Sequence, residues 1–373
     1  MRKLYIALLL FAASLDAASK YPVDVSYFIA DLKYSKEHGV KICELQHGIL
    51  SIFRGDMYLH GDQGLVIPQV EQIFAEFPMR KWAVNSHLAF RPLATLFKNS
   101  PLWTLLPTPW QIFEDPAFMQ AAATPPQHPD SIDSYQGMVF ARADVFESYS
   151  DFCKKYPGII VAGAPSFPYW IDKYKMSLLF TRDPVVAKVK PEWGLYPSQY
   201  SETLAQTIMS DIPADRFVIK PRGAFEGNGV IIVAKEELDS TLQYILQKSD
   251  ALKNDKDKSY NHWYSDRFDS FLVEKYYGSD EISVDTFEGK TYQPTMRASF
   301  MLIYNNNQVE FRFLAGYWLI PFKSVDEEGS LNECTKAYCK VPYFTKATDE
   351  VVEDVKNQLE VSMSRLYQHM LEG

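Results

Sequence analysis

The chain has 373 residues, of which 47% are hydrophobic and 23% are charged, and its formal net charge is −9. This composition excludes a disordered chain, and the length allows about two or three subdomains with a substantial core. The negative charge argues against a nucleic-acid backbone as the main partner, although a few focused lysines and arginines can still bind phosphate groups.

Residues 1–18 have the layout of a secretory signal peptide. Two basic residues precede an apolar run, and small residues follow as far as Ala18. The apolar run is too short to span a membrane. The alternative interpretation is a buried first strand or helix. We expect an exported protein whose mature form has no membrane span.

The segment after the leader predicts a β-hairpin. Val25–Leu32 and Val40–Leu45 are apolar, and a polar turn separates them. Residues 66–170 then mix helical patterns with short strands such as Ile159–Ala162, which predicts a small α/β domain. Within this domain, Pro101–Pro129 is rich in proline and predicts a loop or linker.

The C-terminal half predicts an α+β fold with antiparallel sheets. Its closing segment shows apolar residues at helical spacing, and its other segments alternate between short strands and turns. The expected elements are a helix at Ile171–Phe180, a glycine-rich hairpin at Phe217–Val233, a helix at Glu236–Gln247, an exposed charged loop at Ser249–Ser265, strands at Phe271–Val273, Glu281–Phe287, Thr295–Tyr304 and Val309–Leu319, and a helix at Asp349–Leu371.

The glycine-rich hairpin is the most informative segment of the chain. Lys220 ends its first β-branched run, and Gly223, Gly227 and Gly229 follow. Glycines permit a tight or positive-φ backbone, so backbone N–H groups can lie over phosphate oxygens while the lysine supplies a charge. Taken alone, the pattern fits an ordinary hairpin with a glycine turn equally well.

Two further motifs flank this hairpin, and together the three resemble the ATP-grasp superfamily. The resemblance implies an α+β fold in which two subdomains clasp a nucleotide. An early lysine, Lys173, lies 47 positions before Lys220, and the resemblance assigns the α- and β-phosphates of ATP to these two lysines. In the later motif, Phe271-Leu-Val-Glu-Lys-Tyr, the residues Glu274, Lys275 and Tyr276 match the hinge that reads the adenine edge.

The same resemblance extends to two residues beyond the hinge. Glu281 lies seven positions after Glu274, where the family carries a glutamate that binds the ribose. Arg297 lies where the family carries an arginine that faces the transferred γ-phosphate. The stretch from Arg297 through Phe313-Leu-Ala-Gly-Tyr317 to Asn332 is also weakly similar to tubulin-tyrosine-ligase-like members.

The family's metal-binding strands are missing after Arg297, where no E-x-N motif follows. The early hairpin offers them instead, because Asp31 is followed thirteen positions later by Glu44-Leu-Gln46. Residues 44 and 46 of a strand point to the same face. The resemblance then implies that Asp31, Glu44 and Gln46 hold Mg²⁺. Gln46 departs from the usual asparagine, and its amide oxygen can still bind Mg²⁺ from one methylene further out.

These motifs imply a circularly permuted ATP-grasp fold. Residues 19–65 would be the permuted metal-binding hairpin of the C-terminal subdomain. Residues 66–170 would be the small α/β domain that precedes ATP-grasp subdomains, and residues 171–373 would form the nucleotide-binding core.

The resemblance implies an ATP-dependent carboxylate–amine ligase, or less often a thiol ligase, that forms an acyl phosphate and releases ADP. ATP and Mg²⁺ would be the cofactors, and Lys220 and Arg297 the catalytic charges. The partners would be a carboxylate-bearing substrate and an amine acceptor, which can be a peptide or a protein. Candidates for holding the carboxylate are Arg222, Asn332 and Lys336.

Other classes of function stay open at this point. The same fold also supports a phosphotransferase with a hydroxyl acceptor, or a non-catalytic module that binds a nucleotide or a partner. A secreted structural protein without a nucleotide is a third alternative.

In an exported chain, Cys334 and Cys339 could form a local disulfide.

Export by the leader conflicts with the use of ATP, because extracytoplasmic spaces of bacteria hold essentially no ATP. The conflict disappears if the protein is delivered into the cytosol of a host cell. It also disappears if the fold is a repurposed scaffold, or if the leader is not cleaved.

Overall fold

The computed structural model describes most of the chain after the predicted leader. The leader itself, Met1–Ala18, lies outside the described residues, as do Phe225 and Glu226 of the glycine-rich loop. Among the described residues, no helix combines the length and the apolarity of a membrane span. The described residues are 20–47, 53–84, 101, 103–140, 148–170, 172–224 and 227–373.

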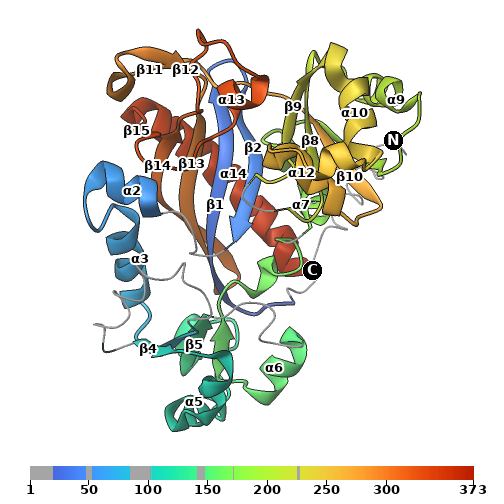
Figure 1. Ribbon diagram of the computed structural model, residues 1–373. Helices are drawn as coiled ribbons and strands as arrows, with labels where there is room; N and C mark the ends of the chain where they lie inside the picture. Colours follow the sequence, from blue (N-terminus) through green and yellow to red (C-terminus); the bar gives the residue numbers. More distant parts are fainter. Residues whose placement is uncertain are drawn as a thin grey trace, which may run out of the picture.

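The described residues form three sheets of four or five strands, one two-stranded hairpin and helices between and around them (Figure 1). This arrangement confirms the predicted α+β class. A five-stranded antiparallel sheet, called here the central sheet, lies in the middle of the molecule. A four-stranded antiparallel sheet, the side sheet, lies to its right in Figure 1, and a four-stranded parallel sheet lies below.

The central sheet joins the N-terminal hairpin to strands from the C-terminal part of the chain. The predicted hairpin is confirmed as a pair of antiparallel strands, and the second half of the chain contributes the neighbours of its first strand. In sheet order the strands are β15 (Phe344–Lys346), β14 (Gln308–Leu319), β13 (Thr295–Asn305), β1 (Asp24–Ser35) and β2 (Gly39–His47).

Both faces of the central sheet are covered, which explains why β1 reads as an almost continuous apolar run. On one face Phe28 and Ala30 pack against the long C-terminal helix α14 (Asp349–Glu372). On the other face Val25, Tyr27 and Ile29 pack against α3 (Val66–Ala75), while α2 (Phe53–His60) lies beside it. Asp31 has the same parity as this second set of residues and therefore lies on the face of α2 and α3.

The parallel sheet below the central sheet belongs to the predicted small α/β region. In sheet order its strands are β4 (Trp103–Leu106), β3 (Arg80–Val84), β5 (Gly137–Phe140) and β6 (Ile159–Val161). Pro101–Pro129 was expected to be a loop, and this prediction is wrong. The segment contains β4, the 3₁₀ helix η2 (Pro109–Glu114) and α5 (Pro116–Ala122). Pro109 and Pro116 start the two helices, where a missing N–H costs nothing. Asp115 caps α5 by accepting from Ala117 N at 2.8 Å.

The side sheet carries the glycine-rich hairpin. In sheet order its strands are β7 (Trp193–Pro197), β10 (Ser270–Lys275), β8 (Arg216–Pro221) and β9 (Ile231–Ala234). The predicted charged loop at Ser249–Ser265 is wrong, because it folds into α11 (Asp250–Lys253) and α12 (Lys258–Ser265). Ser249 and Asp257 cap these two helices, and Trp263 is buried under the side sheet, so the lysines and aspartates are the solvated face of a packed segment.

The remaining elements connect and cover these sheets. Glu281–Phe287 was predicted as one strand, and it divides into a short strand and a 3₁₀ turn. The elements are η3 (Ile132–Ser134), α6 (Tyr149–Lys155), η5 (Ala164–Ser166), α7 (Lys173–Phe180), α8 (Pro184–Ala187), α9 (Leu204–Asp211), η6 (Lys235–Glu237), α10 (Leu238–Leu246), β11 (Ile282–Val284), η7 (Asp285–Phe287), β12 (Lys290–Tyr292) and α13 (Leu331–Thr335).

Candidate functional site

The central sheet places Arg297 directly opposite Asp31. The two residues are register partners on β13 and β1. Arg297 Nε and Nη2 each donate to one oxygen of the Asp31 carboxylate at 2.7 Å, and the arginine is only 7% exposed. Burial alone would lower the pKa of the Arg297 guanidinium, but the ion pair with Asp31 raises it well above the ordinary value. The guanidinium is therefore a permanent positive charge, held in a fixed orientation by two parallel hydrogen bonds.

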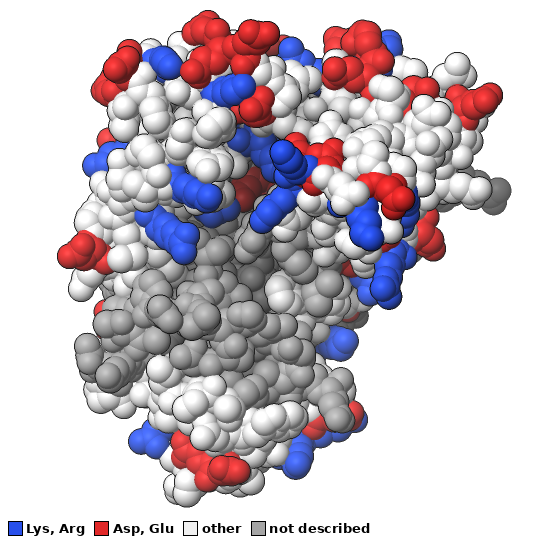
Figure 2. All heavy atoms as spheres, viewed as in Figure 1, with Lys and Arg blue, Asp and Glu red and all other residues white. Residues whose placement is uncertain are grey.

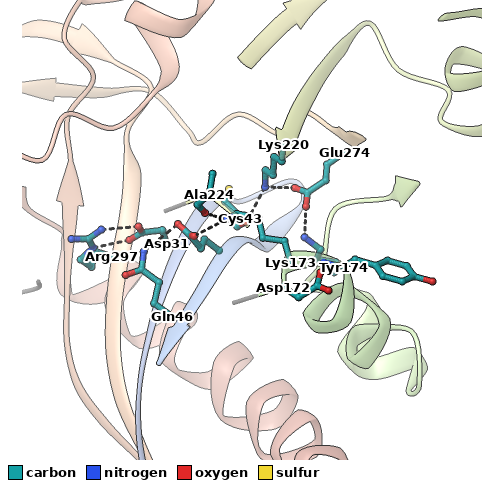
Figure 3. A network of polar contacts seen from close by, with 12 residues as sticks. Asp31, Cys43, Gln46, Asp172, Lys173, Tyr174, Lys220, Ala224, Glu274 and Arg297 are labelled. Carbon is teal, nitrogen blue, oxygen red and sulfur yellow. Dashed lines mark hydrogen bonds and ion pairs between the residues drawn. The ribbon is translucent and has the colours of Figure 1, made fainter. Parts of the chain in front are cut away.

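The next strand of the central sheet adds Glu44 and Gln46. Glu44 is the register partner of Asp31 on β2, and Gln46 Nε2 donates to Glu44 Oε2 at 3.1 Å. Glu44 Oε1 lies 3.4 Å from Lys173 Nζ, which comes from α7. The three residues predicted to hold a metal are therefore neighbours on one patch of the sheet, as Figure 3 shows for Asp31 and Gln46.

A β-bulge in β2 connects this patch to the side sheet. The register of β1 and β2 shifts after Asp31, so that Glu44 faces Asp31 and Ile42 faces Leu32, and Cys43 has no partner. A bulge residue leaves the strand ladder, which frees its backbone groups for other contacts. The freed carbonyl oxygen of Cys43 accepts a hydrogen bond from Lys220 Nζ at 2.8 Å.

The buried carboxylate of Glu274 contacts two buried lysines at the side sheet, and Figure 3 shows it beside Lys220. The carboxylate of Glu274 on β10 accepts one hydrogen bond from Lys220 on β8 and another from Lys190, which lies between α8 and β7. Glu274 is 2% exposed, Lys220 5% and Lys190 9%. Burial would raise the pKa of Glu274, but the two lysines lower it. Burial lowers the pKa of Lys190, whereas at Lys220 the attraction of Glu274 outweighs burial and raises the pKa. When both lysines are protonated, Glu274 neutralises only one of the two charges, which favours an anion beside the cluster.

Lys190 is absent from the residues predicted from the sequence. It stands in the segment Val185-Val-Ala-Lys-Val-Lys190-Pro, whose only available signal is a lysine within a β-branched run. The partner that makes Lys190 significant, Glu274, is 84 positions away. Periodicity cannot connect residues at that separation.

Lys173 begins α7, and its helix is anchored to the start of the glycine-rich loop. Asp172 caps the helix by accepting from Tyr174 N at 3.0 Å. The Asp172 carboxylate also pairs with Arg222, with distances of 3.2 Å to Nε and 2.6 Å to Nη2. Lys173 Nζ donates to the carbonyl oxygen of Ala224 as well as approaching Glu44. Arg222, a predicted ligand for the substrate carboxylate, thus has Asp172 as its carboxylate partner in this structure.

The glycine-rich loop needs its glycines for two different reasons. Gly227 and Gly229 have φ values of +69° and +71°, a region that side chains with a Cβ rarely adopt. A Cβ on Gly229 would also lie 2.6 Å from Pro221. Gly223 has no such backbone, but a Cβ there would lie 2.5 Å from the ring of Phe268. The loop therefore depends on glycine for conformation at two positions and for close packing at the third.

Asn332 and Lys336, the other two predicted carboxylate ligands, have other partners. Asn332 Oδ1 accepts from the backbone N–H of Ile232 on β9 at 2.9 Å. Lys336 Nζ donates to the carbonyl oxygen of Gly227 at 2.6 Å and to Ser259 Oγ at 2.9 Å. Both residues belong to the segment around α13, which in Figure 1 lies between the central and side sheets. In this structure Asn332 binds the side sheet at β9, and Lys336 holds the glycine-rich loop against Ser259.

The predicted adenine hinge has its backbone donors already in use. Lys275 N donates to Glu192 O at 2.8 Å, and Tyr276 N donates to Arg216 O at 3.0 Å. Glu274 directs its side chain at the two buried lysines, as described above. Glu281, the predicted ribose ligand, is exposed, and its Oε1 accepts from Gln293 Nε2 at 3.3 Å.

A pocket lies between β2 and α7, next to these charged groups. Lys190, Glu274, Lys173 and Glu44 line its charged side, and most of the other lining residues are apolar. In Figure 2, lysine and arginine side chains gather around the hollow in the upper middle of the molecule. The apolar lining includes Ile42, Leu45, Tyr169, Trp170, Met176 and Phe180.

The residues present fit a metal ion that arrives together with phosphate groups. Within the described ranges, no three or more His, Cys, Asp or Glu side chains form a preassembled metal site. Mg²⁺ rarely uses a cage made of protein alone, and it is usually bound through one or two carboxylates together with substrate phosphates. Glu44, Asp31 and the amide oxygen of Gln46 supply oxygen donors of this kind. The lysines around them carry positive charges of the kind that pair with phosphate groups.

The four cysteines are free in the structure, so Cys334 and Cys339 form no disulfide with each other here. Cys43 lies in the bulge of β2, and burial raises the pKa of its thiol. The Cys43 thiol is therefore not prepared to act as a thiolate near neutral pH.

No protein-family model matches the chain, and no curated protein matches it. Among solved structures, the chain is similar to a glutathione synthetase-like effector from Globodera pallida, with 13% identity, 80% of this chain and 73% of that chain covered, and a TM-score of 0.43. It is also similar to a putative gamma-glutamylcysteine synthetase from Methylobacillus flagellatus, with 9% identity, coverage of 93% and 88%, and a TM-score of 0.43. A D-alanyl-alanine synthetase A from Vibrio cholerae gives 10% identity, coverage of 78% and 81%, and a TM-score of 0.37. The low TM-scores restrict each similarity to the general course of the backbone.

Proposed function

We propose that this chain is an ATP-dependent ligase of the ATP-grasp type, which joins a carboxylate to an amine, or less often to a thiol, through an acyl phosphate. One observation carries the proposal. Carboxylates and an arginine from the central sheet meet three lysines from the side-sheet region in one network, in which Lys173 pairs with Glu44 and Lys220 bonds to the bulge at Cys43. Separate sheets that present phosphate-binding cations and metal-binding oxygens to each other form a site suited to phosphoryl transfer.

The order of strands in the central sheet supports a circular permutation. β1 and β2 come from the start of the chain, yet they extend the sheet formed by β13 and β14. Asp31 and Arg297 are separated by 266 positions in the sequence and are opposite each other in the sheet. Under this proposal the hairpin takes the role that metal-binding strands at the C-terminal end would have in an unpermuted chain.

The roles of the residues follow from their charge and position. Lys173, Lys190 and Lys220 would neutralise the phosphate groups, and Arg297 would face the group that is transferred. Glu44, Asp31 and Gln46 would hold Mg²⁺, which supplies charge neutralisation between the phosphates. No side chain need act as a nucleophile, because positioning and charge neutralisation account for most catalysis of phosphoryl transfer.

The direct test is ADP release from Mg·ATP in the presence of mixtures of amino acids and short peptides, followed by mass spectrometry of the products. A new amide with stoichiometric ADP supports the ligase. A phosphorylated hydroxyl product would indicate the phosphotransferase instead. Failure of ATP to bind, tested by calorimetry and by thermal stabilisation of the full chain, would contradict both activities.

We also propose that the protein is exported by its leader and reaches ATP in the cytosol of another cell. This rests on the layout of residues 1–18, which lie outside the described part of the chain. Fractionation of cells that express the full chain, with N-terminal sequencing of the product, tests it. A product that keeps Met1 and stays in the cytoplasm would contradict export.

A further inference from the structure

Lys336 lies outside the ATP-grasp motifs of the sequence, yet its ammonium group binds the end of the glycine-rich loop. Lys336 Nζ donates to the carbonyl oxygens of Gly227 at 2.6 Å and of Val230 at 3.4 Å. Its third acceptor is the hydroxyl of Ser259 on α12, at 2.9 Å. All three acceptors are uncharged oxygens, so hydrogen bonding holds the ammonium group without neutralising its charge.

We propose that Lys336 is a positioning residue for the nucleotide, because it holds the glycine-rich loop in the conformation that receives a phosphate group. The inference rests on the proposed function, in which the phosphates of ATP are the anions at this loop. It gives Lys336 a role that acts through the backbone of the loop, in place of the contact with a substrate carboxylate that the sequence suggested. The resemblance to ATP-grasp proteins does not supply this role.

The first step of the argument is the orientation of one peptide group. The carbonyl oxygen of Gly227 accepts from Lys336 and also, at 3.3 Å, from Val230 N, which closes a tight turn over residues 227–230. The C=O and N–H of a planar trans peptide point in opposite directions, so the N–H of Asn228 faces away from Lys336. No described residue accepts a hydrogen bond from Asn228 N. This N–H is therefore a donor that an anion can use.

The second step is the fixed position of the backbone that carries the lysine. Thr335 O, one position before Lys336, accepts from the buried ammonium group of Lys33 on β1 at 3.0 Å. Ala337, one position after Lys336, forms a β-bridge with Pro321, which follows β14. These contacts hold the base of the side chain on the central sheet, while its end binds a loop of the side sheet. Lys336 therefore fixes the loop relative to the sheet that carries the predicted metal ligands.

The third step concerns the charge of the ammonium group. Burial lowers the pKa of Lys336, and Asp257 acts in the opposite direction. The Asp257 carboxylate caps α12 by accepting from Ser259 N at 2.7 Å. A partly buried ammonium group whose hydrogen-bond acceptors are neutral is stabilised by an anion nearby. A phosphate group at the loop would supply that anion, so Lys336 should contribute to phosphate affinity through charge as well as through orientation.

The test measures the affinity of the full chain for the magnesium complex of AMPPNP, a non-hydrolysable analogue of ATP, by calorimetry. Lys336→Met keeps the apolar stem and removes the charge and the donors, so we expect binding to weaken by about tenfold or more. Lys336→Arg keeps a positive charge and can donate to the same oxygens, so it should bind within about threefold of the wild type.

Ser259→Ala tests whether the effect passes through the lysine. It removes one acceptor of the ammonium group, and we expect it to weaken binding by about threefold. In the Lys336→Met background the same substitution should have no further effect, because the contact that it removes is already absent. Equal losses in both backgrounds would overturn the inference.

Lys323→Met is the matched control, because Lys323 belongs to the same connection between β14 and β15. Its ammonium group donates to Glu328 O at 2.9 Å and to Glu333 Oε2 at 3.2 Å, both within that connection. The substitution removes the same charge without touching the glycine-rich loop, so binding should stay within about twofold of the wild type. Circular dichroism verifies the fold of every variant.

Wild-type affinity in folded Lys336→Met, or an equal loss of affinity in Lys323→Met, overturns the inference and leaves the proposed function standing. If Lys336→Met does not fold, Ser259→Ala and Lys336→Arg decide, and wild-type affinity in Ser259→Ala overturns the inference. Absence of analogue binding by the wild type overturns the proposed function and, with it, this inference.

Discussion

Lys220 Nζ donates to the carbonyl oxygen of Cys43 at 2.8 Å, and this bond ties the edge of the central sheet to the side sheet. The same ammonium group pairs with Glu274 inside the side sheet. Lys220 thus makes one contact within its own sheet and one contact between the two sheets. Substitution at this position should therefore change both ligand affinity and the cohesion of the two parts.

We predict that Lys220→Ala lowers the affinity for Mg·ATP by about 2–3 kcal/mol, the value of a charged hydrogen bond to phosphate. The protein should still fold, because Glu274 keeps Lys190 as a partner. Calorimetric titration of the variant beside the wild type measures the loss, and a thermal melt verifies the fold. Unchanged ATP affinity in a folded variant would remove Lys220 from the site.

Glu274→Gln should destabilise the fold by about 3–5 kcal/mol, because Lys190 and Lys220 would remain buried without a counter-charge. Urea denaturation measures this loss. The control is Glu192→Gln. The Glu192 carboxylate lies 3.7 Å from Lys275 Nζ, and its side chain is 58% exposed. This substitution should change the free energy of unfolding by less than about 1 kcal/mol. Replacing Lys190 by Met in the Glu274→Gln background should recover part of the loss. Equal stability of Glu274→Gln and wild type would contradict the charge cluster.

Because of the buried carboxyl group of Asp24, we expect the free energy of unfolding to depend on pH in an unusual way. It is fully buried at the start of β1, where it accepts hydrogen bonds from Ser26, Gly163 N and Tyr367 OH. Burial raises its pKa from 3.8 to about 7, and the hydrogen bonds only partly offset this effect. A carboxyl group whose pKa is higher in the folded than in the unfolded protein destabilises the fold when it ionises.

The penalty from Asp24 is therefore fully present above about pH 7 and disappears as the pH falls towards 4. Its size is on the order of 4 kcal/mol, from about three pKa units at 1.36 kcal/mol each. Asp24→Asn should flatten this part of the profile, because the amide has the shape of the carboxyl group and does not titrate. The midpoints of urea denaturation, measured from pH 5 to pH 8 for the wild type and Asp24→Asn, test the prediction. The same change of midpoint with pH in both proteins would contradict it.

Arg297→Lys should lower kcat for ADP formation more than it weakens ATP binding. Lysine keeps the charge, but it cannot make the two parallel hydrogen bonds that orient the guanidinium on Asp31. Loss of orientation affects the transferred group most, so the variant should lose about tenfold or more in kcat, which corresponds to about 1.4 kcal/mol of barrier. Single-turnover kinetics separates the two effects. A variant with normal kcat and weak ATP binding would give Arg297 a role in binding only.

The N-terminal hairpin could be predicted because its information is local. Apolar runs on both sides of a polar turn indicate paired strands, and the parity of residues 44 and 46 places both on one face. The bulge at Cys43 could not be predicted, because it depends on how β2 meets the side sheet. Residues 1–18 and part of the glycine-rich loop stay predictions, since they lie outside the described residues.

The two wrong loop predictions, for Pro101–Pro129 and Ser249–Ser265, have a common physical cause. In both segments the composition favours loops, but capping residues and a few buried side chains decide the structure. Trp263 is 1% exposed and Phe118 is fully buried, and each is the kind of anchor that fixes a short helix to a core. Composition averages over a window and hides single anchors of this type.

The pairing of β1 with β13 has a consequence for how the chain comes to be folded. During synthesis, β1 can pair early with β2, but it emerges long before its other partner, β13, because Asp31 and Arg297 are 266 positions apart. Until β13 and α14 leave the ribosome, a strand whose two faces are both apolar has no sheet to join. Such a strand is exposed to aggregation and to wrong pairing, and contacts of high sequence separation form slowly. The chain should therefore depend on chaperones while it is made, and versions truncated before β13 should be insoluble.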